Sequence, residues 1–407
     1  MIRDMKTQPI RVPYALAVFG APERKAVAEV LKTPMIVPGK RVREFEQKIA
    51  DLFGKRFGVM VNSGSSANLL AFELLDLPRG SEVITPALTF STTLAPIIQK
   101  GLVPVFCDVV AGEYTADIKD IERLISKKTK ALMIPSLIGN IPDYKKLRAL
   151  AKKHHLYLIE DSCDTLGAKL YGKPTGTFSD ITTSSFYASH IITAGGTGGI
   201  ICVNDREWQQ RLKVLAGWGR ASAINESESV RERFAGRIGG FPYDRKFLFN
   251  DIGYNFQSTE ISGAFGLAQL ERFKGFYAKR QRNFKRLLGF FKQYERFFVL
   301  PEQHKEVDTA WLAFPLVVKG DAPFRREALV EFLEEHNIQT RPIFTGNVLR
   351  QPAFRSIKRR TRKGGYPVAD LVMRGSLLIG CHNGLTDAML QHLFTTFESF
   401  MQKYRLR

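Results

Sequence analysis

Short apolar runs alternate with helix-like stretches between about residues 57 and 203 of this chain. The runs RFGVMVN, SEVITP and VPVFCDV each have the length and apolar character of a strand, and a turn or helix-like stretch follows each of them. This alternation predicts an α/β fold with a mostly parallel sheet and helices on both faces. The loops that follow the strands of such a sheet meet at one edge, where ligands bind.

The second half of the chain has a different pattern. A long amphipathic helix is predicted within residues 258–297, and residues 305–407 mix helices with strands such as 338–344. We therefore expect a large α/β domain over residues 1–265 and a smaller α+β domain over residues 266–407.

The chain of 407 residues has a formal net charge of +20. Its basic residues are spread along the chain except for KRRTRKGG at 358–365, which we interpret as a solvated surface loop rather than a nucleic-acid site. A small anionic ligand, such as a nucleotide diphosphate ester, would profit equally from a positive field. We expect no nucleic-acid partner, although the charge alone does not decide the question.

Neither a membrane span nor a metal centre is expected. No apolar run is long enough to cross a bilayer, and the first 15 residues lack the apolar core of a signal peptide, so a cytoplasmic location is expected. The four cysteines occur singly, without a C-x-x-C pair, which favours buried reduced thiols over zinc or iron–sulfur ligands.

Two of the loops at the predicted sheet edge offer groups for a phosphorylated aromatic ligand. In NSGSSANLL, Gly64 and Ser65 open a helix whose free N–H groups suit a phosphate, although such a turn alone more often only caps the helix. In TPALTF, Phe90 offers a stacking face, although on spacing alone it is more often a core residue.

Two further loops carry the ionisable groups. LIEDSCD ends an apolar strand with Glu160, Asp161 and Asp164, and Asp161 directly follows the strand, so it is the one expected to point into a site. A buried carboxylate there could keep a pyridine-type nitrogen protonated. SSFYASH supplies Ser185 and His190. A lone histidine is more often structural, but four polar loops at one edge favour a functional site.

The segments NSGSSANLLAF, TPALTFSTTLAPI, VPVFCDV, EDSCDTLGA, GTFSDITTSSFYASHIIT and DIGYNFQSTEISGAFGLAQLERF occur in this order. Together they resemble the DegT/StrS sugar aminotransferase family of fold-type I pyridoxal phosphate enzymes. The resemblance runs over roughly residues 10–400. It implies a fold-type I large domain, a pyridoxal or pyridoxamine phosphate cofactor and a homodimer with shared active sites.

Most members of this family carry a lysine in a Ser-Phe-x-x-x-Lys motif, where it forms the internal aldimine, but this chain has His190 at that position. A histidine there resembles the 3-dehydratase branch, which removes the C3 hydroxyl from nucleotide-linked 4-keto-6-deoxyhexoses. The resemblance therefore implies a non-covalently bound pyridoxamine or pyridoxal phosphate, with L-glutamate restoring the amine form.

The resemblance also implies roles for single residues near the cofactor. Asp161 would pair with the pyridine nitrogen, Phe90 would stack on the ring, and Asp164 lies where many aminotransferases have glutamine, near the phenolic oxygen. The implied phosphate ligands are Gly64, Ser65 and Ser185.

Three more positions follow from the same resemblance. Asn255, in GYNFQ, would reach the cofactor phosphate of the neighbouring subunit, which is why shared active sites are expected. Arg341 and Arg350, in TRPIFTGNVLRQP, are candidates for the substrate phosphates.

The exchange of lysine for histidine has a chemical consequence. An imidazole cannot form a Schiff base with the cofactor aldehyde, whereas its ordinary pKa near neutrality suits a general base. His190 is therefore the candidate base for the proton at the C4′ carbon of the cofactor, and a candidate acid for the hydroxyl that leaves C3. Without a lysine, elimination is favoured over transamination.

Two further features of the sequence bear on this interpretation, and the second is a departure from the family pattern. The stretch 217–240 contains no cysteine, so a reductive cycle that depends on an iron–sulfur cluster is not expected. The chain has AGGTGG where the family commonly has Gly-Glu-Gly-Gly. The alternatives are an aminotransferase that acts on another keto sugar and a catalytically silent relative that still binds the cofactor.

Overall fold

A seven-stranded sheet forms the centre of the protein, for which a computed structural model describes residues 10–224 and 229–404. Its strands are β1 (Phe57–Val61), β2 (Glu82–Pro86), β3 (Val103–Cys107), β4 (Thr129–Pro135), β5 (Tyr157–Asp161), β8 (Ile181–Ser185) and β9 (Gly199–Val203). The strand order is β1-β9-β8-β5-β4-β2-β3, and only β9 runs antiparallel to its neighbours. The predicted mostly parallel sheet is confirmed.

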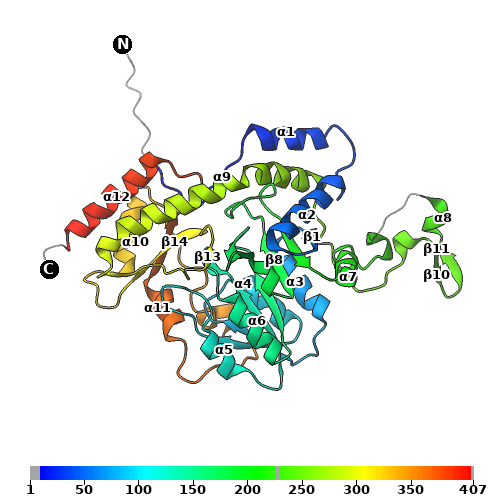
Figure 1. The fold of residues 1–407 in the computed structure, drawn as a ribbon, viewed down its shortest axis with the longest axis horizontal. Coiled ribbons are helices and arrows are strands. Elements are labelled where there is room, and N and C mark those ends of the chain that lie inside the picture. The colour runs from blue at the N-terminus through cyan, green and yellow to red at the C-terminus, as the bar shows by residue number, and fades with distance from the viewer. Residues whose placement is uncertain (1–9, 225–228, 405–407) are drawn as a thin grey trace, which may run out of the picture.

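Helices cover both faces of this sheet (Figure 1). Along β4, Ala131 and Met133 belong to one apolar cluster, whereas Leu132 and Ile134 belong to another. This alternation is the two-residue period of a strand that is buried on both sides. The helices in this part of the chain are α1 (Ala21–Val30), α2 (Lys40–Phe53), α3 (Gly64–Leu75), α4 (Ser91–Gln99), α5 (Ile118–Leu124), α6 (Tyr144–Lys153) and α7 (Arg206–Ala216).

The C-terminal part is a smaller α+β unit. A three-stranded antiparallel sheet forms its centre, in the order β12-β14-β15. Residues of β14 and β15 belong to the same apolar cluster as one face of the large sheet, so a single core joins the two parts. Its elements are β12 (Phe298–Val299), β14 (Ala313–Val318), α10 (Arg326–Glu335), α11 (Pro367–Gly375), β15 (Ser376–Gly380) and α12 (Asp387–Gln402).

Helix α9 (Glu260–Phe291) is 32 residues long and runs from the large part to the C-terminal part (Figure 1). The predicted long helix is therefore present. The predicted domain boundary at residues 265/266 lies within this continuous helix, and the division into two domains stays a prediction.

The strand predicted at 338–344 is wrong. This segment is extended but makes only isolated bridges, through Ile338 and Arg341. Pro342 has no N–H to donate to a ladder, and the backbone of Phe344 has a φ of +45°, which a strand does not allow. The segment instead places Arg341, Pro342 and Phe344 beside a cavity at the edge of the large sheet.

Two small units complete the fold. A three-stranded sheet is formed by β6 (Lys169–Leu170), β7 (Lys173–Pro174) and β13 (Val307–Asp308). An arm of residues 229–249, with α8 (Val230–Arg233) and the hairpin of β10 (Gly236–Ile238) and β11 (Phe241–Tyr243), projects from the body of the protein (Figure 1).

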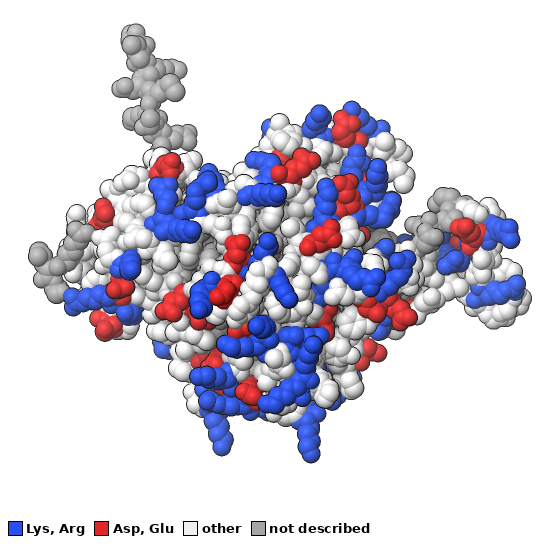
Figure 2. Space-filling model, in the orientation of Figure 1, with Lys and Arg blue, Asp and Glu red and all other residues white. Residues whose placement is uncertain are grey.

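The basic run at 358–365 is only partly a solvated loop. Arg360 donates two hydrogen bonds to the carboxylate of Glu82, and Arg362 forms ion pairs with Asp108 and Asp120. These arginines attach the C-terminal part to the large sheet. Figure 2 shows Lys and Arg over much of the visible face, interspersed with Asp and Glu.

Within the part of the chain that the structure describes, no helix has the length and apolar character needed to cross a membrane.

Two glycines of α9 should respond oppositely to alanine. A Cβ on Gly263 would lie 2.7 Å from the backbone nitrogen of Val42, whereas a Cβ on Gly275 would meet no atom within 4 Å. We expect Gly263→Ala to lower the free energy of unfolding by about 1–3 kcal/mol, because α2 and α9 are forced apart. We expect Gly275→Ala to raise it by about 0.5–1 kcal/mol through helix propensity. Urea unfolding of both variants tests this pair, and a loss of stability in Gly275→Ala would contradict it.

Candidate active site

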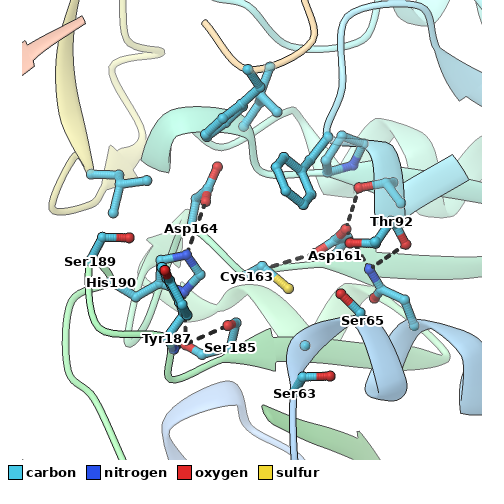
Figure 3. Close-up of a pocket in the computed structure, with 18 of the residues that line it drawn as sticks. Ser63, Ser65, Thr92, Asp161, Cys163, Asp164, Ser185, Tyr187, Ser189 and His190 are labelled. Atoms are coloured by element: carbon cyan, nitrogen blue, oxygen red, sulfur yellow. Dashed lines mark hydrogen bonds and ion pairs between the residues drawn. The ribbon is translucent and has the colours of Figure 1, made fainter. Parts of the chain in front are cut away.

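A cavity of about 480 Å³ lies at the carboxyl edge of the large sheet. The loops after β1, β2, β4, β5 and β8 line it, together with Tyr14 from the N-terminal segment and the segment 341–344. The four loops that the sequence predicted to meet therefore do meet. In Figure 3, Asp164 and His190 lie at one end of the cavity, and Asp161 and Ser65 lie at the other.

The start of α3 forms one wall of the cavity. Ser63 caps the helix by accepting a hydrogen bond from the Ser66 N–H, at 3.1 Å. Gly64 must be a glycine, because a Cβ there would lie 2.7 Å from both the Sγ of Cys163 and the Cβ of Ser185. Ser65 is exposed and lines the cavity. The N-terminus of α3, the exposed Ser65 and the nearby Ser185 together offer hydrogen-bond donors that suit an anion.

The AGGTGG tail closes the loop between β8 and β9. Gly198 has a φ of +134° and pairs with Ser63, and a Cβ on Gly199 would lie 2.3 Å from the Ser63 carbonyl. Thr197 donates a hydrogen bond to the carbonyl oxygen of Asn62, at 2.7 Å. The tail thus brings the histidine loop against the start of α3, and only glycine fits at its last two positions.

Asp161 is buried and held by three hydrogen bonds. Its Oδ2 accepts from Asn68 Nδ2 at 2.9 Å and from Thr93 Oγ1 at 2.7 Å, and its Oδ1 accepts from the backbone N–H of Cys163 at 3.1 Å. These bonds orient the carboxylate at the floor of the cavity. Glu160, by contrast, accepts hydrogen bonds from Ser162, Ser179 and Thr182 inside the protein and does not line the cavity.

Phe90 lines the cavity, and its side chain is 48% exposed, so it is not the core residue that its spacing alone suggests. Its ring contacts the ring of Phe344 edge-on, with the centroids 5.7 Å apart. The neighbouring Thr345 donates a hydrogen bond to the Thr89 carbonyl, which attaches the Phe90 loop to the C-terminal part. One face of Phe90 is therefore available to a ligand.

His190 faces Asp164. The Nδ1 of His190 lies 3.2 Å from the carbonyl oxygen of Ser185, and its Nε2 lies 3.9 Å from the Oδ1 of Asp164. A carbonyl oxygen only accepts, so in the neutral imidazole the proton lies on Nδ1 and the lone pair on Nε2. The Nε2 lone pair is therefore the one that faces Asp164.

The carboxylate of Asp164 is held by the backbone of Ile138, which has an unfavourable conformation. Its Oδ2 accepts a hydrogen bond from the backbone N–H of Ile138, at 2.8 Å. Ile138 has a φ of +58°, in the left-handed region that β-branched residues rarely adopt. The carbonyl oxygen of Ile138 accepts from the Leu312 N–H, which helps hold this conformation. Because Oδ2 is engaged, Oδ1 is the oxygen that remains toward His190.

Burial shifts the pKa values of this pair in opposite directions. Desolvation lowers the pKa of His190 from 6.5 to about 4, and the nearby Arg280 acts in the same direction. Desolvation raises the pKa of Asp164 from 3.8 to about 7 despite the Ile138 hydrogen bond, and the charge of Asp161 adds to the rise. Both groups therefore favour their uncharged forms in the cavity.

Arg280 of α9 supports the histidine loop from behind. Its guanidinium is fully buried and donates to the backbone oxygens of His190, Leu312 and Trp311, and to Asn383 Oδ1. Sequence analysis did not identify it, because an arginine in an amphipathic helix has no signal that distinguishes it from a surface residue. Sequence analysis also missed four residues whose type and position carry no sign that they contact the site: Tyr14, Asn68, Thr93 and Ile138.

The structure does not bring all of the predicted residues to the cavity. Arg341 lines it, and its guanidinium lies 5.9 Å from the ring centre of Tyr14. Arg350 lies outside the cavity lining and is paired with Asp370 through two hydrogen bonds. Asn255 is exposed and also lies outside this lining, so its role toward a second subunit stays a prediction.

Among the described residues, no group of three or more His, Cys, Asp or Glu side chains is placed to hold a metal ion. Of the cysteine-free stretch at 217–240, residues 225–228 lie outside the described part of the chain.

Comparison with known proteins gives the same assignment as the motifs. The model of the DegT/DnrJ/EryC1/StrS aminotransferase family matches residues 19–398. The chain belongs to this family. It is 37% identical over 399 residues to the dTDP-4-dehydro-2,6-dideoxy-D-glucose 3-dehydratase of Saccharopolyspora spinosa, with 95% of this chain and 86% of that protein covered.

Two other similar proteins have names that indicate different activities. A crystal structure of GDP-4-keto-6-deoxymannose-3-dehydratase with a trapped PLP–glutamate geminal diamine has a TM-score of 0.85 and 28% identity, with 95% and 99% of the chains covered. The GDP-perosamine synthase of Escherichia coli O157:H7 is 31% identical over 327 residues, which cover 79% of this chain and 81% of that protein.

As a member of this family, the protein is a sugar-modifying enzyme that uses pyridoxal phosphate and its amine form. The cavity has the groups that this cofactor requires. Asp161 is a buried, oriented carboxylate for the pyridine nitrogen, Phe90 presents a half-exposed ring face, and the start of α3 with Ser65 and Ser185 offers donors for the phosphate.

Asp164→Asn should change how stability depends on pH. Because the pKa of Asp164 is higher in the folded than in the unfolded protein, its ionisation makes the wild type lose stability as the pH rises from about 4 to about 7. Asparagine does not ionise. We therefore expect the variant to gain roughly 2–4 kcal/mol relative to the wild type between pH 4 and pH 8.

Urea unfolding of both proteins at the two pH values measures this difference. The control is Asp387→Asn, which removes an exposed carboxylate paired with Arg286. A difference between wild type and Asp164→Asn that does not change with pH would contradict the prediction.

Proposed function

We propose that this enzyme is a 3-dehydratase that removes the C3 hydroxyl from a nucleotide-linked 4-keto-6-deoxyhexose, with non-covalently bound pyridoxamine phosphate. The observation that carries the proposal is the imidazole of His190 in the cavity at the position where the family has its lysine. Among the described residues that line the cavity, no lysine is present. A cofactor held there would have no amine with which to form a covalent bond to the protein.

When bound, the cofactor would supply an amine that condenses with the sugar ketone and a ring that accepts electrons. Asp161 would keep the ring nitrogen protonated. Its three hydrogen bonds hold the carboxylate in place, so no reorganisation is needed when charge develops. Gly64, Ser65 and Ser185 would hold the phosphate at the start of α3.

His190 would act as the base. Its pKa of about 4 keeps the ring neutral at physiological pH, and Ser185 fixes the tautomer that leaves the lone pair on Nε2. Arg280 holds the backbone of His190, and Tyr187 contacts its ring edge-on with the centroids 6.1 Å apart. A lysine at this place would also return a proton to the sugar C4 carbon, which leads to an amino sugar instead of a deoxysugar.

The second candidate is an aminotransferase acting on another keto sugar, as represented among the relatives by GDP-perosamine synthase. That reaction needs a group that delivers a proton to the sugar C4 carbon. The structural relative with a PLP–glutamate adduct supports L-glutamate as the amino donor for either reaction. The two candidates differ in their products: the dehydratase removes the C3 hydroxyl, whereas the aminotransferase keeps it and leaves an amine at C4.

The functional unit that we propose is a homodimer with shared active sites. Exposed apolar side chains occur in the loop between α1 and α2, where Leu31, Met35 and Val37 are each at least 60% exposed. They also occur in and near the arm, where Phe241 is 74% and Ile252 is 92% exposed. Exposed apolar residues gathered in two segments are typical of an interface, and Asn255 lies close to the second of them in sequence.

The reaction can be tested directly with purified protein. Incubation with pyridoxamine phosphate, L-glutamate and GDP-, CDP-, UDP- and dTDP-linked 4-keto-6-deoxyhexoses should yield a 3-deoxy product from at least one sugar nucleotide. His190→Asn should reduce this turnover by about 10²–10⁴-fold, because the general base is lost. Mass spectrometry distinguishes loss of the hydroxyl from gain of an amine. An amino sugar as the sole product would refute the dehydratase proposal.

The absence of a tether can be tested without a sugar substrate. Borohydride treatment of the wild type with pyridoxal phosphate should leave no adduct at residue 190, whereas His190→Lys should retain a covalently bound cofactor. Peptide mass spectrometry locates the adduct. A specific lysine adduct elsewhere in the wild-type cavity would contradict the proposal.

A further inference from the structure

Dehydration needs two proton transfers, one from the C4′ carbon to a base and one from an acid to the hydroxyl that leaves C3, and His190 is a candidate for both. The first proton leaves the cofactor carbon and the second is added to the sugar oxygen at C3. Both transfers occur in the same elimination, so an acid and a base are needed in one site. The cavity contains a second buried group that faces the histidine, the Oδ1 of Asp164, for which no other hydrogen-bond partner is found in the part of the chain that the structure describes.

We propose that His190 and Asp164 form a one-proton dyad, in which His190 Nε2 is the base and Asp164 Oδ1–H is the acid for the leaving C3 hydroxyl. This inference rests on the proposed dehydratase function. It gives Asp164 a role in proton transfer in addition to the place near the phenolic oxygen that the family resemblance implies.

The geometry defines which atom of each group faces the other. The Nδ1 of His190 is occupied by the Ser185 carbonyl, and the Oδ2 of Asp164 is occupied by the Ile138 N–H. Within residues 10–224 and 229–404, each partner thus has one atom without a hydrogen bond, and these two atoms lie 3.9 Å apart. Catalytic hydrogen bonds are often this long before substrate binds and shorten in the complex.

The surroundings favour one proton on the pair rather than none or two. The groups that face His190 and Asp164 are Asp161 of β5, Arg280 of α9, Tyr14 of the N-terminal segment, and Cys163 and Tyr187. Burial disfavours both the imidazolium and the carboxylate, so between about pH 4 and about pH 7 the proton of the pair lies on Asp164 and His190 is neutral. The combination pairs an acid with a base in one site.

The proton balance closes without another reactant. Nε2 of His190 would accept the proton that leaves the C4′ carbon, and the electron pair of that bond would move into the conjugated system that joins the cofactor to the sugar. The C3–O bond would then break, and its own electron pair would leave with the oxygen. Asp164 Oδ1 gives its proton to that oxygen, so water leaves. Transfer of the proton from His190 Nε2 to Asp164 Oδ1 then restores the dyad. The sugar would be reduced at C3 and the cofactor would be oxidised from its amine to its aldehyde form, and L-glutamate, the proposed amino donor, would return it to the amine form.

The strained Ile138 acts as a positioning residue in this arrangement. Its left-handed backbone aims the N–H at Oδ2, which leaves Oδ1 toward the histidine. Without this hydrogen bond the carboxylate of Asp164 could rotate, either oxygen could face His190, and the defined pairing of Oδ1 with Nε2 would be lost.

The first test measures protonation rather than turnover. In the full chain labelled with ¹⁵N-histidine, with and without pyridoxamine phosphate, His190 is assigned by comparison with His190→Asn. We expect Nε2 of the wild type to show a transition near pH 7, which reports on Asp164, and Asp164→Asn to lose it. The control variant Asp387→Asn should keep the transition. An unchanged His190 titration in Asp164→Asn overturns the proposal.

The second test separates the acid from the base. The base step alone is followed by exchange of the deuterium-labelled C4′ carbon of pyridoxamine phosphate with solvent in the presence of the substrate found above. We expect Asp164→Asn to lower hydroxyl loss about 10²-fold while retaining exchange within severalfold of the wild type, and Asp164→Glu to recover part of the hydroxyl loss. An equal loss of both signals, or of neither, overturns the dyad.

The two proposals fail in different ways. If the wild type dehydrates no sugar nucleotide, the dehydratase function fails, and the histidine titration still reports whether the pair shares a proton. If the wild type does dehydrate and the titration does not depend on Asp164, only the dyad fails.

Discussion

The parallel pairing of β5 with β8 is the constraint on which the active site depends. Asp161 and Thr183 are paired in this register, and the Ser162 N–H continues the ladder by donating to the Thr183 carbonyl. The loop after β5 carries Asp164 and the loop after β8 carries His190, so the register alone brings both to one edge. A slip by one residue would turn Asp161 to the opposite face of the sheet.

The histidine loop is then held from both sides. The glycine tail pairs with Ser63 at the start of α3, and Arg280 donates to the backbone of His190 from α9. A buried guanidinium whose acceptors are neutral oxygens is costly, and its several hydrogen bonds offset that cost. Since the same guanidinium also bonds Leu312 and Asn383, the position of His190 is coupled to the packing of the C-terminal part.

Much of the site was predictable because the signals were local. The strand ends, the glycine of the α3 turn and the apolar run before Asp161 each lie within a few residues of the side chain that they position. Gly64, Asp161 and His190 line the cavity. The strand predicted at 338–344 was wrong because periodicity takes no account of Pro342 or of the positive φ of Phe344. Arg350, which pairs with Asp370 outside the cavity lining, stays a prediction as a substrate ligand.

The sequence by itself determined the sheet, because short apolar runs and turn residues act over short distances. It also determined the family and the exchange of lysine for histidine, because both are properties of motifs that lie within short stretches of the chain. Only the tertiary structure decided which side chains share the cavity and in what chemical state. Tyr14 arrives from the N-terminal segment, Arg280 from α9, and the Ile138 N–H from a strained turn after β4. Burial depends on the packing of all these segments together, and burial is what makes a neutral histidine and a neutral carboxyl group of His190 and Asp164.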